Sequence, residues 1–86
     1  MRVRFNKAFT NQLGKYPHKV QVAFQKRLEL FLNDSMNQLL SNHALTGHWD
    51  GYRSINVSGD LRAVYEMVDE GTAYFVAFGT HSQLYG

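Results

Sequence analysis

The sequence predicts an α+β domain, with an N-terminal strand, a two-helix hairpin and a C-terminal antiparallel β-meander packed on the helices. Apolar residues between positions 20 and 32 recur every three or four residues, which is the spacing of one helix face. After Gly51 the period changes to two, which is typical of strands. The chain has 86 residues, so we expect one domain over residues 1–86 and no second core.

The N-terminus predicts a short strand followed by a short helix. Residues 2–5 (RVRF) alternate polar and apolar side chains, the pattern of a strand with one buried face. Asn6 is a suitable N-cap for a helix over residues 7–13. Gly14 is a suitable place for that helix to end.

A second helix is predicted to begin near Pro17, because proline is well tolerated in the first turn. Residues 33–35 (NDS) should end it. Since the link between the helices is very short, they should form a hairpin. The apolar stripe that faces the core consists of Val20, Ala23, Phe24, Leu28, Phe31 and Leu32.

Residues 35–50 show no regular period, so we expect a packed connection with a helical turn rather than a long element. Three strands should follow, over residues 52–57, 61–68 and 72–80. The polar and glycine-containing segments between them should form tight turns.

The apolar pattern also predicts how these three strands pair, because a slip of one residue would move every side chain to the other face. Val57 should lie opposite Leu61, and Asp69 opposite Thr72. The face covered by the helices would then carry Ile55, Val57, Leu61, Ala63, Tyr65, Met67, Tyr74, Val76 and Phe78. The open face would carry Ser54, Asn56, Arg62, Glu66, Ala77, Gly79 and His81, with Asp60 beside His81.

Composition limits the classes of function. The formal charge is +2 at pH 7 and most of the basic residues lie in the first third of the chain, which suits an anionic partner or simply a solvated positive face. There is no cysteine, so disulfides and thiolate metal sites are excluded. Neither a signal peptide nor a run of transmembrane length is visible, and we expect a cytoplasmic protein with no membrane partner.

The chemistry-bearing residues gather near the C-terminus. The histidines are scattered and the glycines lie at turns, so we expect neither a metal site nor a cofactor. Arg62 and His81 share a predicted face, and Tyr85 follows closely. This set suits RNA cleavage by the neighbouring 2′-hydroxyl, which needs a base, an acid and a cation for the phosphate.

Packing explains the same residues as readily. Arg62 could pair with Glu66 or Asp60 on the surface, and His81 could cap the strand. Tyr85, together with Leu84, could close an edge of the core. His43 would then be structural or solvated, and Trp49 part of the core.

Several motifs resemble the RelE/ParE superfamily of bacterial toxins, closest to its RelE/StbE and YafQ-type branch. They are the histidine before LTG, the GYRS, the GD-x-R-x-VY and the terminal GTHSQLY. The resemblance covers most of the chain and implies a RelE-like β-α-α-β-β-β fold. It also implies a toxin of a type II toxin–antitoxin system that cuts mRNA on the ribosome without a metal and is neutralised by a cognate antitoxin.

The resemblance implies roles for individual residues. His81 matches a C-terminal histidine that acts as acid or base in YafQ-like toxins, and Tyr85 matches a terminal aromatic that lines the site. Arg62 matches a phosphate-binding arginine of RelE. His43 and Asp60 match a histidine and an aspartate of the YafQ site.

Two positions depart from the YafQ pattern, since Asn56 and Ala77 stand where those toxins carry a histidine and an arginine. These departures leave open a degenerate relative that only binds its antitoxin. A second alternative is a ParE-like toxin that binds a protein target such as DNA gyrase and cuts nothing.

Overall fold

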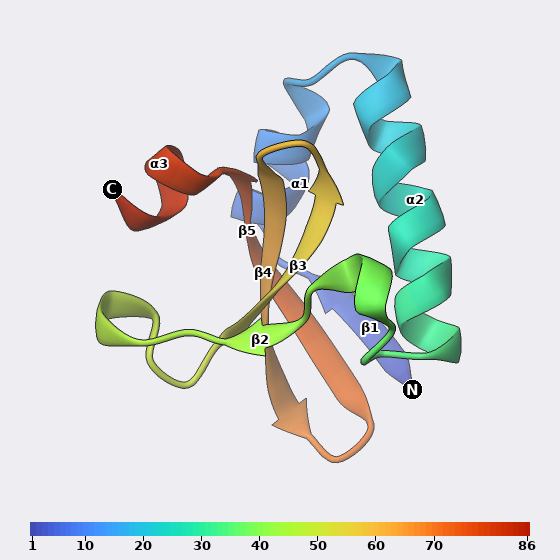
Figure 1. The fold of residues 1–86 in the computed structure, drawn as a ribbon, viewed down its shortest axis with the longest axis vertical. Helices are drawn as coiled ribbons and strands as arrows, with labels where there is room; N and C mark the ends of the chain where they lie inside the picture. Colours follow the sequence, from blue (N-terminus) through green and yellow to red (C-terminus); the bar gives the residue numbers. More distant parts are fainter.

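A five-stranded sheet forms the centre of the protein, and the computed structural model describes all residues 1–86 (Figure 1). The strand order is β1-β5-β4-β3-β2, with β1 parallel to β5 and every other pair antiparallel. The strands are β1 (Arg2–Phe5), β2 (His43–Ala44), β3 (Arg53–Ser58), β4 (Leu61–Asp69) and β5 (Thr72–Thr80).

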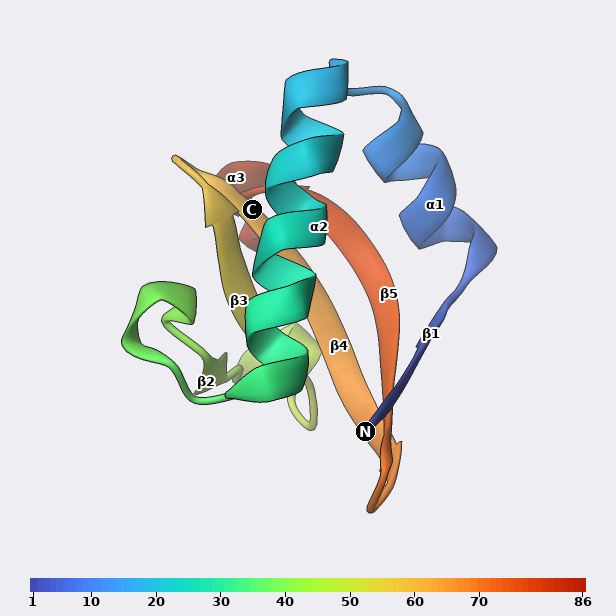
Figure 2. The same cartoon turned by 90° about the vertical axis from the view of Figure 1, so that its right-hand side faces the viewer.

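The helices lie on both faces of this sheet. α1 (Lys7–Gly14) and α2 (His18–Asn33) cover one face, where α1 packs mainly on β5 and α2 on β3 (Figure 2). α3 (His81–Tyr85) lies on the opposite face, which we call the open face. The 3-10 turns η1 (Gln38–Leu40) and η2 (Gly47–Trp49) belong to the connection before β3. The predicted α+β class and element order are thus confirmed.

α1 and α2 begin where the sequence predicts. Asn6 caps α1, because its side-chain oxygen accepts a hydrogen bond from the Phe9 amide at 2.7 Å. Pro17 directly precedes α2. The side chain of Gln12 on α1 accepts a hydrogen bond from the Phe78 amide at 2.8 Å, which satisfies a strand donor that lies beyond the end of β1.

The core between helices and sheet is rich in aromatic rings. Phe75 is fully buried, and its ring lies 5.2–5.9 Å from those of five other aromatic residues. Such edge-on and offset contacts are the favoured aromatic arrangements. The buried core consists of Phe9, Phe24, Phe31, Leu40, Ile55, Val57, Ala63, Tyr65, Ala73, Phe75 and Phe78.

The predicted register is correct at the centre of the meander. Arg62 pairs with Asn56 on one side and with Gly79 on the other, and Asp69 pairs with Thr72. Val57 does not lie opposite Leu61, however, because a bulge at Val57 places Ser58 there. The bulge keeps Val57 in the core while the strand turns.

A second irregularity corrects the predicted faces of β5. Tyr65 pairs with Phe75 and Val64 with Ala77, so Val76 bulges out of the ladder. The bulge lets Phe75 and Phe78, three residues apart, both face the helices. Val76 and Tyr74 therefore lie outside that core, contrary to the prediction.

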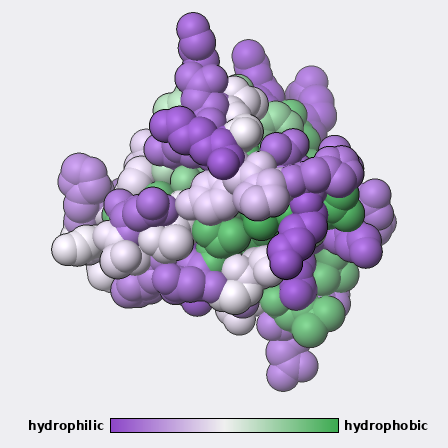
Figure 3. Space-filling model, turned by 90° about the horizontal axis from the view of Figure 1, so that it is seen from above, coloured by the Kyte–Doolittle hydropathy of each residue, from purple (hydrophilic) through white to green (hydrophobic).

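Met67 was also predicted to be buried, and it is 41% exposed. It lies near the β4–β5 turn, which extends beyond the helices (Figure 1). Seen from above, hydrophilic side chains dominate the surface and hydrophobic ones show in smaller areas between them (Figure 3). No helix is long and apolar enough to cross a membrane.

Replacing Phe75 by alanine should lower the free energy of unfolding by about 3–5 kcal/mol, because it leaves a cavity among several rings. Denaturant titration followed by circular dichroism measures this loss. Phe75→Leu fills more of the space and should cost less. A loss below about 1 kcal/mol for the alanine variant would contradict the central packing role.

Candidate active site

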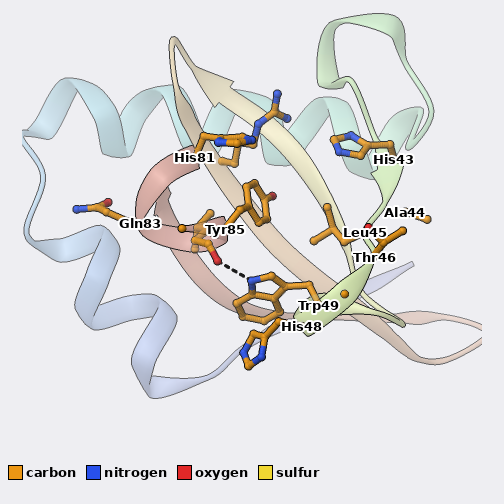
Figure 4. A pocket seen from close by; sticks show the side chains of 13 residues that line it. His43, Ala44, Leu45, Thr46, His48, Trp49, His81, Gln83 and Tyr85 are labelled. Carbon is orange, nitrogen blue, oxygen red and sulfur yellow. Dashed lines mark hydrogen bonds between the residues drawn. The ribbon is translucent and has the colours of Figure 1, made fainter.

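A cavity of about 750 Å³ opens on the open face, between α3, β4 and the connection that contains β2 and η2 (Figure 4). It is the largest of the pockets whose linings are described here, and its volume is within the usual range of ligand sites. Its lining residues are His43, Ala44, Leu45, Thr46, Gly47, His48, Trp49, Arg62, His81, Gln83, Leu84, Tyr85 and Gly86.

The floor beneath the cavity is apolar. Leu45, Val64 and Ala77 are buried together on the open face, and partly buried aromatic and aliphatic side chains surround them. The sequence pattern predicts a polar surface with small residues here. The second cluster is not visible in that pattern, because Leu45 and Trp49 come from the irregular segment before β3.

The C-terminal segment is a short helix rather than a continuation of the strand. Thr80 and Gln83 form a capping box, in which the Gln83 side chain accepts from the Thr80 amide at 2.8 Å and Thr80 Oγ1 accepts from the Gln83 amide at 3.2 Å. A Cβ at position 79 would lie 2.8 Å from Gln83 Oε1, so Gly79 leaves the space that this cap needs.

Two long-range hydrogen bonds hold α3 against the fold. The Trp49 indole N–H donates to the Leu84 carbonyl oxygen at 2.8 Å, as the dashed line in Figure 4 marks. The Tyr16 hydroxyl donates to Gln83 Oε1 at 3.2 Å. These contacts attach the last residues to both the η2 loop and the link between α1 and α2.

His81 and Tyr85 project from α3 as neighbours one helical turn apart. Their rings lie 4.7 Å apart at 71°, an edge-to-face contact. The His81 side chain is exposed, whereas the Tyr85 hydroxyl is buried without a hydrogen-bond partner. A buried hydroxyl without a partner is uncommon, and this one belongs to a side chain that lines the cavity.

Arg62 reaches the same cavity from β4. It is half-buried, and its Nη1 atom has no hydrogen-bond partner. Arg62 and His81 therefore lie on one side of the sheet, as the predicted register required. Asn56, its neighbour on β3, also has a buried side-chain oxygen without a partner.

His43 enters the cavity from β2, on the other side of Tyr85 from His81 (Figure 4). Its Nδ1 atom lies 2.8 Å from the Ser41 carbonyl oxygen. Since a carbonyl can only accept, Nδ1 carries the proton in this contact. In the neutral ring the Nε2 atom is then the free base.

A half-buried polar network fixes the backbone next to His43. The Asn42 amide donates to the Ser35 carbonyl at 2.7 Å and to the Tyr65 hydroxyl at 2.8 Å. Its carbonyl oxygen accepts from Arg53 Nε at 2.9 Å. Asn42 therefore links β2, which has only two residues, to the segment that follows α2 and to the central sheet.

Asp60 is not part of the cavity lining. It is exposed in the turn between β3 and β4. Asp60 does not pair with His81 in the ladder, because the last pair of β4 and β5 is Leu61 with Thr80 and His81 begins α3. Ala77, which with Asn56 departs from the YafQ pattern, is buried in the apolar floor.

Some lining residues were not singled out from the sequence. The η2 loop brings His48 and Trp49 to the cavity, and Gln83 lies at its α3 wall. The two glycines around a tryptophan, Gly47 and Gly51, could have indicated a tight loop, since both have positive φ angles. No group of three or more His, Cys, Asp or Glu side chains could hold a metal ion.

The chain belongs to a family of bacterial toxins of type II toxin–antitoxin systems, because the family model matches residues 1–86. That family is the YafQ toxin family. No match was found among curated proteins.

Solved structures share the fold. YafQ from Escherichia coli strain BL21(DE3) superimposes with a TM-score of 0.79 at 23% identity over 100% of both chains. A chain of the E. coli DinJ–YafQ complex gives 0.78 at 24% identity, again over 100% of both. The YoeB/ParE toxin from Agrobacterium tumefaciens gives 0.78 at 14% identity, over 94% of this chain and 99% of that one.

Trp49→Phe should loosen α3, because it keeps an aromatic ring but removes the indole donor to Leu84. We expect a loss of about 0.5–1.5 kcal/mol in unfolding free energy and faster amide exchange in residues 81–86. Hydrogen exchange measured by NMR tests this. Tyr74→Phe, near the start of β5, is the control and should leave α3 unchanged.

Glu66→Gln should lower the pKa of Tyr52. A hydrogen bond and the negative charge of Glu66 hold the pKa of this phenol above its usual value of 10.0. The neutral phenol is thus favoured in the folded state, and its contribution to stability is present below the usual pKa and is lost as pH rises through the raised one. Ultraviolet titration of the wild type and the variant compares the two values, and equal values would contradict the contact.

Proposed function

We propose that this toxin is a ribosome-dependent mRNA endoribonuclease that uses only side chains for acid–base catalysis. The observation that carries the proposal is that one cavity is lined by His43, His81, Arg62 and Tyr85. Cleavage by the 2′-hydroxyl needs a proton acceptor, a proton donor and a cation, and these four side chains supply them.

His43 is the general base in this proposal. Its Nδ1–H contact with the Ser41 carbonyl leaves Nε2 as the acceptor, and Figure 4 shows the ring turned toward the cavity. His43 Nε2 would take the proton from the 2′-hydroxyl of the bound nucleotide. The 2′-oxygen would then attack the phosphorus and form a 2′,3′-cyclic phosphate.

His81 is the general acid on the opposite side of Tyr85. In its protonated form it would donate to the 5′-oxygen as the phosphorus–oxygen bond breaks. Two imidazoles on opposite sides of the cavity suit this reaction, because the attacking and leaving oxygens lie on opposite sides of the phosphorus. At the end of one turnover His43 holds the extra proton and His81 lacks one.

Arg62 would bind the phosphate during the reaction. Its Nη1 atom lacks a protein partner, and a phosphate oxygen would give it one. Tyr85 would stack on the base of the cleaved nucleotide and donate its free hydroxyl. Asp60 lies outside the lining, so we assign it no part in proton transfer.

A protein antitoxin is the second partner that we propose. The superimposed YafQ chain from E. coli was solved in a complex with DinJ, and this chain shares its fold over the full length. mRNA on the ribosome would be the substrate, and the cytoplasm is accordingly the compartment that we propose.

Substitution of the proposed catalytic residues tests the reaction. His43→Ala and His81→Ala should each slow mRNA cleavage by about 10²–10⁴-fold. Arg62→Ala should slow it by about 10²–10³-fold, because a charge that stabilises the phosphate is lost. Induced expression in bacteria, growth curves and primer extension on a translated reporter mRNA give the readout.

His18→Ala is the matched control, because His18 is an exposed histidine at the start of α2. It should cut as the wild type does. Unchanged cutting by His81→Ala would overturn the assignment of the acid. Growth arrest with intact mRNA and inhibited DNA supercoiling would instead indicate a toxin that acts on gyrase, and normal growth without antitoxin would indicate a degenerate relative.

A further inference from the structure

The cavity extends beyond the four side chains that the proposed reaction uses. Its lining continues past Tyr85 and Leu84 to residues 46–49 of the η2 loop. In Figure 4 His48 and Trp49 lie at the end of the cavity away from His81. A volume of about 750 Å³ leaves room beside the reacting groups for a further part of the substrate.

Trp49 gives this end of the cavity a fixed wall. Its indole N–H is held by the Leu84 carbonyl at 2.8 Å. Its ring also meets Tyr52 edge-on, with centroids 5.3 Å apart at 81°. A half-buried ring that is held on two sides loses little conformational entropy when a ligand binds next to it.

The His48 ring lies next to the Trp49 ring. Its imidazole is exposed and lies 5.5 Å from the Trp49 ring at 82°. The loop that presents it begins at Gly47, with φ of +64°, and is followed by Gly51, with φ of +93°. These backbone conformations favour glycine. The loop is held by two backbone hydrogen bonds, from the Trp49 amide to the Thr46 carbonyl and from the Asp50 amide to the Gly47 carbonyl.

We propose that His48 and Trp49 form a second base-binding subsite, for the nucleotide on the 5′ side of the one that is cleaved, because they lie away from His81, the proposed leaving-group acid. The inference rests on the proposed endoribonuclease function. Aromatic rings and histidine stack on unpaired bases of single-stranded RNA, and this subsite would hold one such base while Tyr85 holds its neighbour. Since the subsite touches a base rather than the reacting phosphate, it would influence which sequences are cut.

Binding of short oligonucleotides tests the subsite without relying on cleavage. The probes are a 2′-O-methyl RNA dinucleotide, which supplies only the two nucleotides joined by the reacting phosphate, and a mixed-sequence 2′-O-methyl tetranucleotide, which also supplies a nucleotide on the 5′ side. Both lack the attacking hydroxyl. His48→Ala should weaken tetranucleotide binding by about 5- to 100-fold, the range of one lost base stack, and leave dinucleotide binding unchanged. NMR titration up to millimolar concentrations measures both.

Two further variants sharpen the result. His48→Phe keeps a flat ring and should bind the tetranucleotide within about twofold of the wild type, since stacking tolerates a change of ring. His18→Ala should bind both probes as the wild type does. The subsite is overturned if His48→Ala binds the tetranucleotide normally, weakens both probes equally or is not rescued by phenylalanine, or if the wild type does not bind the tetranucleotide.

The outcome is distinguishable from failure of the proposed reaction. If the wild type binds the tetranucleotide through His48 but leaves translated mRNA intact, the proposed subsite is supported and the proposed endoribonuclease activity is contradicted. If His48→Ala cuts mRNA with the wild-type distribution of sites, mapped by sequencing the new 5′ ends, the proposed subsite is contradicted and the proposed reaction is supported.

Discussion

The bulge at Val76 is the constraint on which the arrangement of the two faces depends. Phe75 and Phe78 both reach the aromatic core, which a regular strand would forbid for residues three apart. The extra residue lets Phe75 occupy the centre of the core, while Ala77 still faces the other way beside Val64. One irregularity therefore serves two apolar clusters, one on each side of the sheet.

The second cluster determines where the candidate active site lies. α3 is five residues long and could not persist alone, because isolated helices of this length are unstable in water. Its position comes from the capping box, from Leu84 and Tyr85 packed on the open face, and from the Trp49 hydrogen bond. β2 is shorter still, and Asn42 holds it through side-chain contacts. The two proposed catalytic histidines thus stand on elements that depend on distant parts of the chain.

Two of the residues that line this cavity, Arg62 and Tyr85, each bury a polar atom with no protein partner. Ser54 and Asn56 on β3 do so as well, outside the lining. Such groups cost stability unless something else satisfies them. For Arg62 and Tyr85, the proposed chemistry gives a phosphate and a base as the partners that would satisfy them.

The sequence by itself determined the element order, the pairing of Asn56, Arg62 and Gly79, and the shared face of Arg62 and His81, because periodicity and turn residues act locally. It could not determine the bulges at Val57 and Val76, which depend on which aromatic residues fit one core. Nor could it place His48, Trp49 and the α3 helix, since long-range hydrogen bonds position them. Asp60 and His81 do not pair for a related reason, since the helix that the capping box begins ends the ladder at Leu61 and Thr80. Tertiary structure decided these features because their energies arise between residues far apart in the chain.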